Sequence, residues 1–268
     1  MRPTIRHILT ITLAFAALYA GGTNGPSASE KQQMIDSIRA DLPMARTPAE
    51  RIRMLTDIFD LSNDTSLKDS IGSVIYDLAL QTGDSDAGLD ILRHLGNLHV
   101  KEDSLLAVDI SRAQNFRPTP NRDITVTFLR MLRNHNGLRY ADETTRIHRL
   151  QQLLEISNAN PPSDIYEKIV LLHALCLYIG NTSQGEMLIH YMDKLEELIT
   201  SLPKESIPLR SAFYTQAAII YRQNDDYEKG LQIDRQRLEC IRLLEQGNAK
   251  AGRKYRNYDA HYYVIYTH

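Results

Sequence analysis

Helix-start signals recur along this chain at nearly regular intervals, and this recurrence constrains the fold more than any other feature. Apolar residues follow a helical period almost everywhere, while the alternation typical of β-strands is nearly absent. Capping residues, prolines and glycines divide the pattern into pairs of short helices. We place the pair starts near residues 47, 84, 119, 163, 206 and 250. Their spacing, about 35 to 44 residues, is typical of an α-solenoid, whereas an irregular helical bundle predicts no such recurrence.

Local capping chemistry supports these boundaries. Thr47-Pro48-Ala49-Glu50 combines an N-cap, a proline at the first helical position and a glutamate three residues after the cap. Further helix starts are predicted at Ser66 with Asp69, at Asp84 and Asp86, at Ser163-Asp164 and at Ser206. Helix C-termini are predicted at Gly83, Gly137 and Gly247. A lead helix over residues 29–41 precedes the pairs.

The first 22 residues have the layout of a secretory signal peptide. Arg2 and Arg6 precede the thirteen-residue apolar run Ile8–Ala20, and small residues follow it. A bilayer-spanning helix needs about 20 apolar residues, so this run is too short to cross a membrane. We therefore expect residues 1–22 to be removed, residues 23–46 to form a linker and lead helix, and the protein to be exported to the periplasm or another extracytoplasmic compartment. The alternative is an uncleaved N-terminal anchor.

Composition indicates a globular chain with no electrostatic preference for a polyanion. Its 268 residues are 43% hydrophobic, and 31 basic residues oppose 33 acidic ones. Neither nucleic acid nor an anionic membrane surface is therefore expected as a partner. The two cysteines, Cys176 and Cys240, stand in apolar helical contexts that favour buried thiols. An exported protein also permits a disulfide between them.

The segment YTQAAIIYRQNDDYEKG, Tyr214 to Gly230, places small residues where a helix usually carries leucine. Two antiparallel helices approach most closely where one offers a very small side chain to the other. We expect Ala218 and Gly230 to be these contact positions, with Ala217 beside them and the space around them filled by Tyr214, Tyr221 and Tyr227.

This order of aromatic, small and turn residues resembles a tetratricopeptide repeat. Leu92, Leu95, Gly96 and His99 form a second, fainter copy. The match is incomplete, because the second helix of the better copy carries Asp234 and Arg237 where the family has an aromatic and a small residue. The resemblance implies a right-handed α-solenoid of about five to six helical hairpins over residues 47–268, the last one incomplete.

The same resemblance implies a peptide-binding concave groove lined by the first helix of each pair. The groove positions carried over from the family are Thr215 and Ile219, with Arg222 one turn further, and Arg93 and Asn97 in the second copy. An arginine and an asparagine at these places are similar to the pair with which some family members hold a peptide carboxylate. The alternative is an ordinary solvated helix face.

No catalytic or metal-binding signature stands out. The chain has no HExxH, Walker A, GxSxG or dinucleotide glycine motif. Its helical histidines, among them His94, His99 and His173, lack the partner spacing of a metal site. Asp60 to Asp64 faintly resembles a calcium loop, but it lacks the turn glycine and the closing glutamate, so an inter-helix turn is the simpler interpretation. We expect no enzyme activity, metal or cofactor.

The C-terminal segment KYRNYDAHYYVIYTH repeats tyrosine at three- to four-residue intervals. We interpret it as the first helix of another pair, although an aromatic ligand platform is an alternative. Either it packs on a partner or the natural polypeptide continues, and such a continuation is the one route by which we expect a membrane span. The layout resembles the extracytoplasmic input region of bacterial envelope sensors. We therefore expect an exported module that binds a protein or peptide in signal transduction. A free-standing exported scaffold or assembly factor is the alternative, and an enzyme on this scaffold a third.

Overall fold

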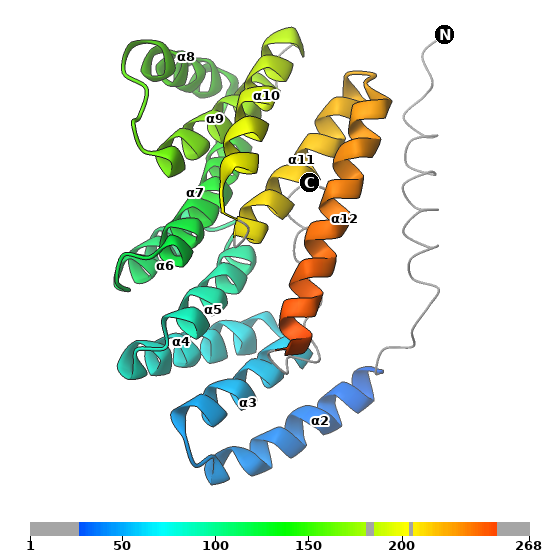
Figure 1. Ribbon diagram of the computed structural model, residues 1–268. Helices are drawn as coiled ribbons and strands as arrows, with labels where there is room; N and C mark the ends of the chain where they lie inside the picture. The colour runs from blue at the N-terminus through cyan, green and yellow to red at the C-terminus, as the bar shows by residue number, and fades with distance from the viewer. Residues whose placement is uncertain (1–26, 181–184, 204–205, 251–268) are drawn as a thin grey trace.

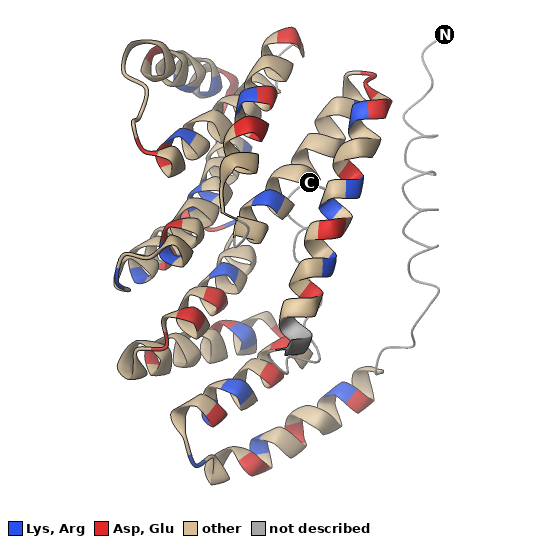
Figure 2. Ribbon diagram, viewed as in Figure 1, with Lys and Arg blue, Asp and Glu red and all other residues tan. Residues whose placement is uncertain are grey.

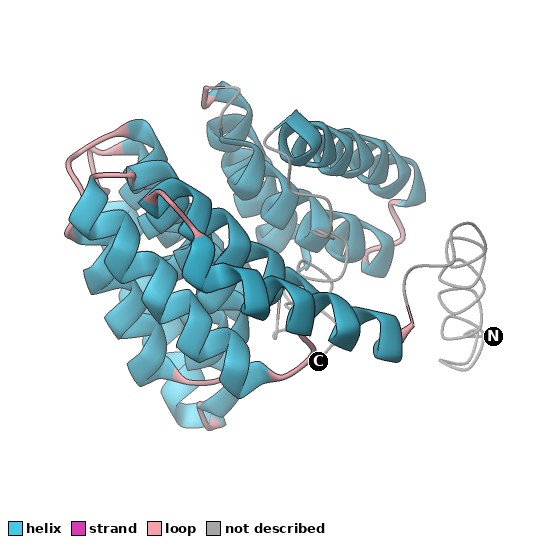
Figure 3. Cartoon of the chain, turned by 90° about the horizontal axis from the view of Figure 1, so that it is seen from below, coloured by secondary structure: helices cyan, strands magenta, loops and turns pink. Residues whose placement is uncertain are grey.

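The computed structural model describes residues 27–180, 185–203 and 206–250 of the chain. All regular structure within them is helical, as the sequence predicts (Figure 1; Figure 3 gives a second view). The elements are α2 (Ala28–Asp41), the 3-10 helix η1 (Leu42–Met44), α3 (Pro48–Leu61), α4 (Thr65–Thr82), α5 (Ser85–Leu98), α6 (Asp103–Gln114), α7 (Pro120–Tyr140), α8 (Glu143–Ala159), α9 (Ile165–Ile179), α10 (Gly185–Ser201), α11 (Ile207–Gln223) and α12 (Tyr227–Lys250). The predicted signal peptide, residues 1–22, and the tyrosine-rich C-terminal segment lie outside the described residues.

The helix starts agree closely with the sequence. Helices α3, α5, α7, α9 and α11 begin within two residues of five predicted pair starts, and α2 matches the predicted lead helix. The sixth predicted start, near residue 250, coincides with the end of α12. The rest of that predicted pair lies beyond the described part of the chain.

Side-chain caps explain why the starts were predictable. Thr47 accepts a hydrogen bond from the Glu50 backbone N–H at 3.1 Å, and the Glu50 carboxylate accepts one from the Arg46 N–H. Asp84 caps α5 in the same way. One expected cap was displaced by two residues: Asp64, not Ser66, caps α4. At the predicted Ser163-Asp164 start, Asp164 caps α9. An aspartate at each position reaches two backbone N–H groups of the first turn.

The predictions of helix ends were less accurate than those of helix starts. Gly83 has φ 72° and ends α4 in the left-handed region, as expected. The predictions for Gly137 and Gly247 were wrong, because both glycines lie inside helices. Helix α7 continues past Gly137 to Tyr140 and ends where Ala141 adopts an extended conformation before the Asp142 cap of α8.

Helices adjacent in sequence pack together along most of the fold, and α5, α7 and α9 also pack side by side. Two contacts depart from a simple series of hairpins. Helix α8 packs against α9 and does not form a tight hairpin with α7, consistent with its single buried residue, Leu153. Helix α11 contacts α7 as well as α10 and α12. It is therefore buried nearly all round from Ser211 to Ala218.

Both cysteines are buried, free thiols in the core. Cys176 lies in α9 and Cys240 in α12. Burial raises the pKa of each thiol, that of Cys240 to about 11. They therefore behave as small apolar core residues, as one of the two interpretations predicted.

Glycines in α4 and α5 allow close contact with neighbouring side chains. A Cβ atom on Gly96 would lie 2.3 Å from Leu129 Cδ2 of α7, and one on Gly88 would lie 2.3 Å from the Phe116 ring. Gly72 is similarly close to Leu95. Gly96, the small residue of the Leu92–His99 copy, thus allows two successive first helices, α5 and α7, to pack closely.

Alanine substitutions at Gly88 and Gly137 should therefore have opposite effects on stability. Alanine at Gly88 forces the buried Phe116 ring to move, and such overpacking costs about 1–3 kcal/mol. At exposed Gly137 the nearest atom to an added Cβ is Tyr178 Oη at 3.7 Å, so alanine should stabilise α7 by up to about 1 kcal/mol. Urea unfolding of both variants measures the difference. Equal destabilisation would contradict the packing at Gly88.

Candidate functional site

Arg93, one of the predicted groove residues, is committed to contacts within the fold. Its Nη1 donates to Asn121 Oδ1 at 3.0 Å and to Thr125 Oγ1 at 2.6 Å, both on α7. Its Nη2 pairs with Asp90 at 3.2 Å, and the two side chains are only 13% and 12% exposed. Arg93 is therefore a bridge between α5 and α7 and offers little of its guanidinium to a ligand.

Asn97, predicted to hold a peptide carboxylate together with Arg93, binds the backbone of its own helix instead. Its Nδ2 donates to the Arg93 backbone carbonyl at 3.1 Å, one turn earlier in α5. Its Oδ1 is buried without a hydrogen bond. The prediction of an open Arg–Asn carboxylate grip was wrong in its geometry, because α7 packs against this side of α5.

The second predicted set, on α11, is dispersed between core and surface. Thr215 is buried and donates to the Ser211 carbonyl at 2.9 Å, so it does not line an open groove. Ile219 is half-buried. Arg222 is exposed, and its guanidinium pairs with Asp234 of α12. Thr215 is buried because α7, α10 and α12 all pack against α11.

Most residues expected to serve packing lie in the core between α11 and its neighbours. Tyr214, Ala217, Ala218 and Tyr221 are all buried. A Cβ on Gly230 would lie 2.8 Å from Arg222 Cγ and 3.5 Å from the Ala218 carbonyl oxygen, so α11 and α12 approach closely there. Tyr227 was predicted wrongly, since 63% of it is exposed and it fills no interior space.

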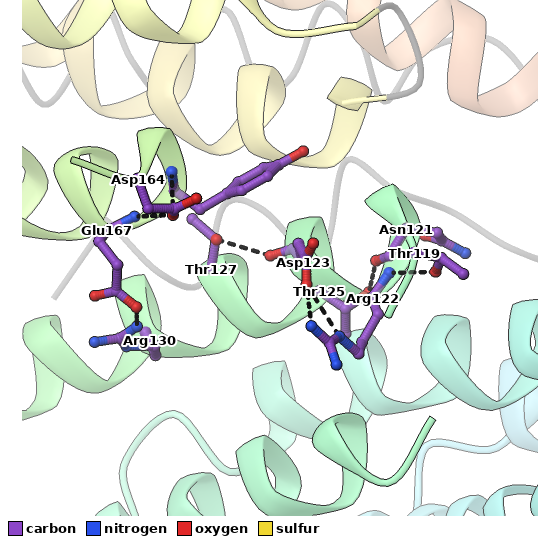
Figure 4. Close-up of polar contacts among 10 residues, drawn as sticks. Thr119, Asn121, Arg122, Asp123, Thr125, Thr127, Arg130, Asp164 and Glu167 are labelled. Atoms are coloured by element: carbon purple, nitrogen blue, oxygen red, sulfur yellow. Dashed lines mark hydrogen bonds and ion pairs between the residues drawn. The ribbon is translucent and has the colours of Figure 1, made fainter. Parts of the chain in front are cut away.

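Helix α7 carries a polar face that was not predicted from the sequence (Figure 4). Thr119 caps the helix by accepting from the Arg122 N–H at 3.2 Å. The Arg122 guanidinium contacts Asp123 Oδ1 through Nε at 3.0 Å and Nη2 at 2.7 Å. One turn beyond Val126, Arg130 pairs with Glu167 in the first turn of α9. We call Arg122, Asp123, Arg130 and Glu167 the α7 polar face.

The α7 polar face differs from the Arg93 bridge in its accessibility. The Arg130 and Glu167 side chains are 37% and 46% exposed, and those of Arg122 and Asp123 are 23% and 36% exposed. Ion pairs this exposed contribute little to stability, about 0–1 kcal/mol. Their guanidinium groups can therefore exchange an internal carboxylate for an external one. The signal in the sequence was the spacing of Arg122, Val126 and Arg130, four residues apart along one side of a helix.

A separate cluster, buried except for Asp69, joins three helices through His99, the C-cap of α5. Its Nδ1 contacts Asp109 of α6 at 2.6 Å, and its Nε2 contacts Asp69 of α4 at 3.1 Å. Asp109 is fully buried and also lies 3.7 Å from Arg112. Burial lowers the pKa of His99, but the hydrogen bond to Asp109 and the charges of Asp109 and Asp69 outweigh it, so the pKa is raised overall. The expectation of an unremarkable helix histidine missed this cluster because its two acids are distant in sequence.

His173 in α9 has the opposite electrostatic environment. It is buried, and Gln216 of α11 is the polar side chain facing its ring. Burial lowers its pKa to about 3, with a smaller contribution from His135. Folding therefore holds this imidazole in its neutral form.

Nothing in the described ranges indicates a metal centre or a membrane-spanning helix. No group of three or more histidine, cysteine, aspartate or glutamate side chains is placed to hold a metal ion there. Asp64, in the segment that resembles a calcium loop, caps α4. None of the described helices combines the length and apolar character needed to cross a bilayer. Comparisons with protein-family models, with curated proteins and with solved structures give no match.

The His99 cluster predicts a stability contribution that decreases as pH rises. Because the folded pKa is raised above the ordinary value of about 6.5, protonated His99 stabilises the fold below about pH 6.5. That stabilisation is lost as pH rises through the folded value. His99→Gln should cost about 3 kcal/mol at pH 6 and less at pH 9, measured by urea unfolding. His148→Gln, on the surface of α8, is the control, and a cost independent of pH would refute the interpretation.

His173 predicts the reverse dependence on pH. Because its folded pKa lies below the unfolded value, the neutral ring favours folding above about pH 6.5, and this contribution falls as pH drops toward 3. His173→Leu should remove a slope of up to about 1.4 kcal/mol per pH unit between pH 6 and 4. Unfolding curves of the variant and the parent in this range test it. An unchanged acid slope would show that other groups control acid stability.

Proposed function

We propose that this chain is an exported tetratricopeptide-like module that binds a protein or peptide and serves as the sensory input region of a bacterial signal-transduction protein. The support is the recurrence of helix starts at α3, α5, α7, α9 and α11, together with the side-by-side packing of α5, α7 and α9. In this proposal the helices belong to a right-handed α-solenoid of about five to six hairpins. The proposed activity is binding, without catalysis.

The observation that carries the proposal is the accessibility of Arg122 and Arg130 on the α7 polar face. A guanidinium group binds a carboxylate through two parallel hydrogen bonds, which gives both strength and orientation. An acidic partner segment replaces Asp123 and Glu167 as the acceptor, at little cost to the fold because both internal pairs are at least partly exposed. The partner is therefore an acidic peptide or an acidic loop of a protein. This replaces the predicted Arg93–Asn97 grip with a site on the next first helix.

Because of the position of α7, binding there can change the packing of neighbouring helices. Helix α7 contacts α5, α6, α9 and α11, more elements than a terminal helix reaches. Arg130 binds Glu167, and Asn134 donates to the Val170 carbonyl at 3.1 Å, so polar contacts fasten α7 to α9 along two turns. Loss of the Arg130–Glu167 pair on partner binding loosens one of these contacts. A shift of α9 against α7 is the proposed signal.

Selection from a random peptide library tests the proposal without a known partner. Peptides enriched on the parent protein should be rich in aspartate and glutamate, and should lose about tenfold in affinity for an Arg122→Ser, Arg130→Ser variant, because two exposed Arg–carboxylate pairs of up to about 1 kcal/mol each are removed. Arg53→Ser, which removes an exposed arginine of α3, is the matched control.

Two outcomes would reject this site. Enrichment of peptides without acidic residues would reject the carboxylate chemistry. Acidic peptides that bind the Arg122→Ser, Arg130→Ser variant as tightly as the parent would place binding elsewhere. Circular dichroism should show the same helix content for all three proteins, since both ion pairs lie at the surface.

A further inference from the structure

Helix α12 carries an apolar stripe on its open side. Tyr227, Leu231 and Leu238 are 63%, 54% and 41% exposed. At 100° per residue these positions fall within an arc of about 40° on the helix surface. The opposite side of α12 is buried against α11 through Gly230, Ile233, Cys240 and Ile241. Figure 1 shows α12 at one edge of the described fold, with its outer side away from α11.

Charged residues also lie along α12 (Figure 2), and some of them extend this stripe. The extended stripe consists of Tyr227, Leu231, Asp234, Arg235, Leu238 and Arg242, and its spacing is symmetric. The steps between them are 4, 3, 1, 3 and 4 residues, so the pattern reads the same in both directions about the Asp234–Arg235 bond. A symmetric pattern on one helix can meet a second copy of itself when the two helices run antiparallel about a two-fold axis.

The chemistry at matched positions is complementary. Antiparallel pairing about that axis places Leu231 against Leu238 of the second copy, which buries both apolar side chains. It places Arg235, which is exposed, against the carboxylate of Asp234. That carboxylate contacts Arg222 and lies 3.5 Å from Arg237 on its own chain, and 24% of the Asp234 side chain is exposed, so a further guanidinium can reach its open edge. The Tyr227 ring meets the Arg242 guanidinium, a cation–π pair. Each contact occurs twice.

We propose that the exposed face of α12 docks on a second copy of this chain, antiparallel and with the two-fold axis between residues 234 and 235. The stripe from Tyr227 to Arg242 is about 22 Å long at 1.5 Å per residue. One helix face of this length buries less than the roughly 1,200–2,000 Å² of a stable standard interface. The association is therefore weak and depends on concentration. It is independent of the acidic partner proposed for α7, since the two surfaces share no residue.

Analytical ultracentrifugation of the full chain over a concentration series tests the docking. The parent should show reversible monomer–dimer exchange, and Leu238→Asp should abolish it by placing a carboxylate against Leu231 of the second copy. Leu243→Asp is a matched control, because Leu243 is also 41% exposed but lies about 140° away from Leu238 around the helix. The control should dimerise like the parent. Equal loss in both variants, or a parent that stays monomeric at all concentrations, would overturn the proposal.

Cysteine trapping tests the register. A mixture of Leu231→Cys and Leu238→Cys chains should form a disulfide-linked dimer under a mild oxidant, because the two thiols face each other. Either variant alone should not, since two copies of residue 231 stand seven residues apart along the axis, about 10 Å, beyond the reach of a disulfide. Native Cys176 and Cys240 are buried and should stay reduced. If each single variant formed as much disulfide-linked dimer as the mixture, the proposed antiparallel register would be overturned. If the thiol of the Leu238→Cys variant were inaccessible to the oxidant while the chain stayed monomeric, another part of the same chain would cover the stripe, and the docking proposal would be overturned.

Discussion

The side-by-side packing of α5, α7 and α9 is the constraint on which the rest of the fold depends. It is made close by a missing side chain at Gly96, where Leu129 of α7 occupies the space that a Cβ would take. It is made specific by polar contacts, since Arg93 fixes α7 against α5 and Asn134 fixes it against α9. In the proposed function the same contacts separate two classes of polar residue. Those directed into the layer of helices are structural, and those at its accessible edge, such as Arg130, are the ones proposed to meet a partner.

Helix starts were predictable because their chemistry is local. An N-cap side chain such as Thr47 or Asp84 satisfies backbone N–H groups two or three residues later, so the sequence contains both partners. Helix ends were harder, because a glycine ends a helix only where the chain must turn. Gly83 meets that condition, whereas Gly137 lies on an exposed side of a continuing helix. The packing of α8 against α9, and not α7, likewise depends on contacts that no local pattern encodes.

The candidate site was less predictable than the fold, and Arg93 shows why. Its position in α5 was placed correctly, but its role depends on Asn121 and Thr125, about 30 residues later in the chain. The His99 cluster has the same character, because Asp69 lies 30 residues before it and Asp109 ten residues after it. Sequence periodicity identifies which side of a helix is polar. It does not identify which neighbour that side meets, and for a charged residue the neighbour determines whether the charge is used by the fold or by a ligand.

The contact between α11 and α7 has a consequence for how the chain unfolds. In a stack where each unit touches only its neighbours, the terminal unit can open alone while the remainder stays folded. Here the last described pair is joined to a helix in the middle of the chain, about 80 residues earlier in sequence. Separating α11 and α12 from the other helices therefore also exposes the surface of α7 that α11 covers. This long-range connection extends cooperativity across the fold and raises its contact order above that of an open helical array.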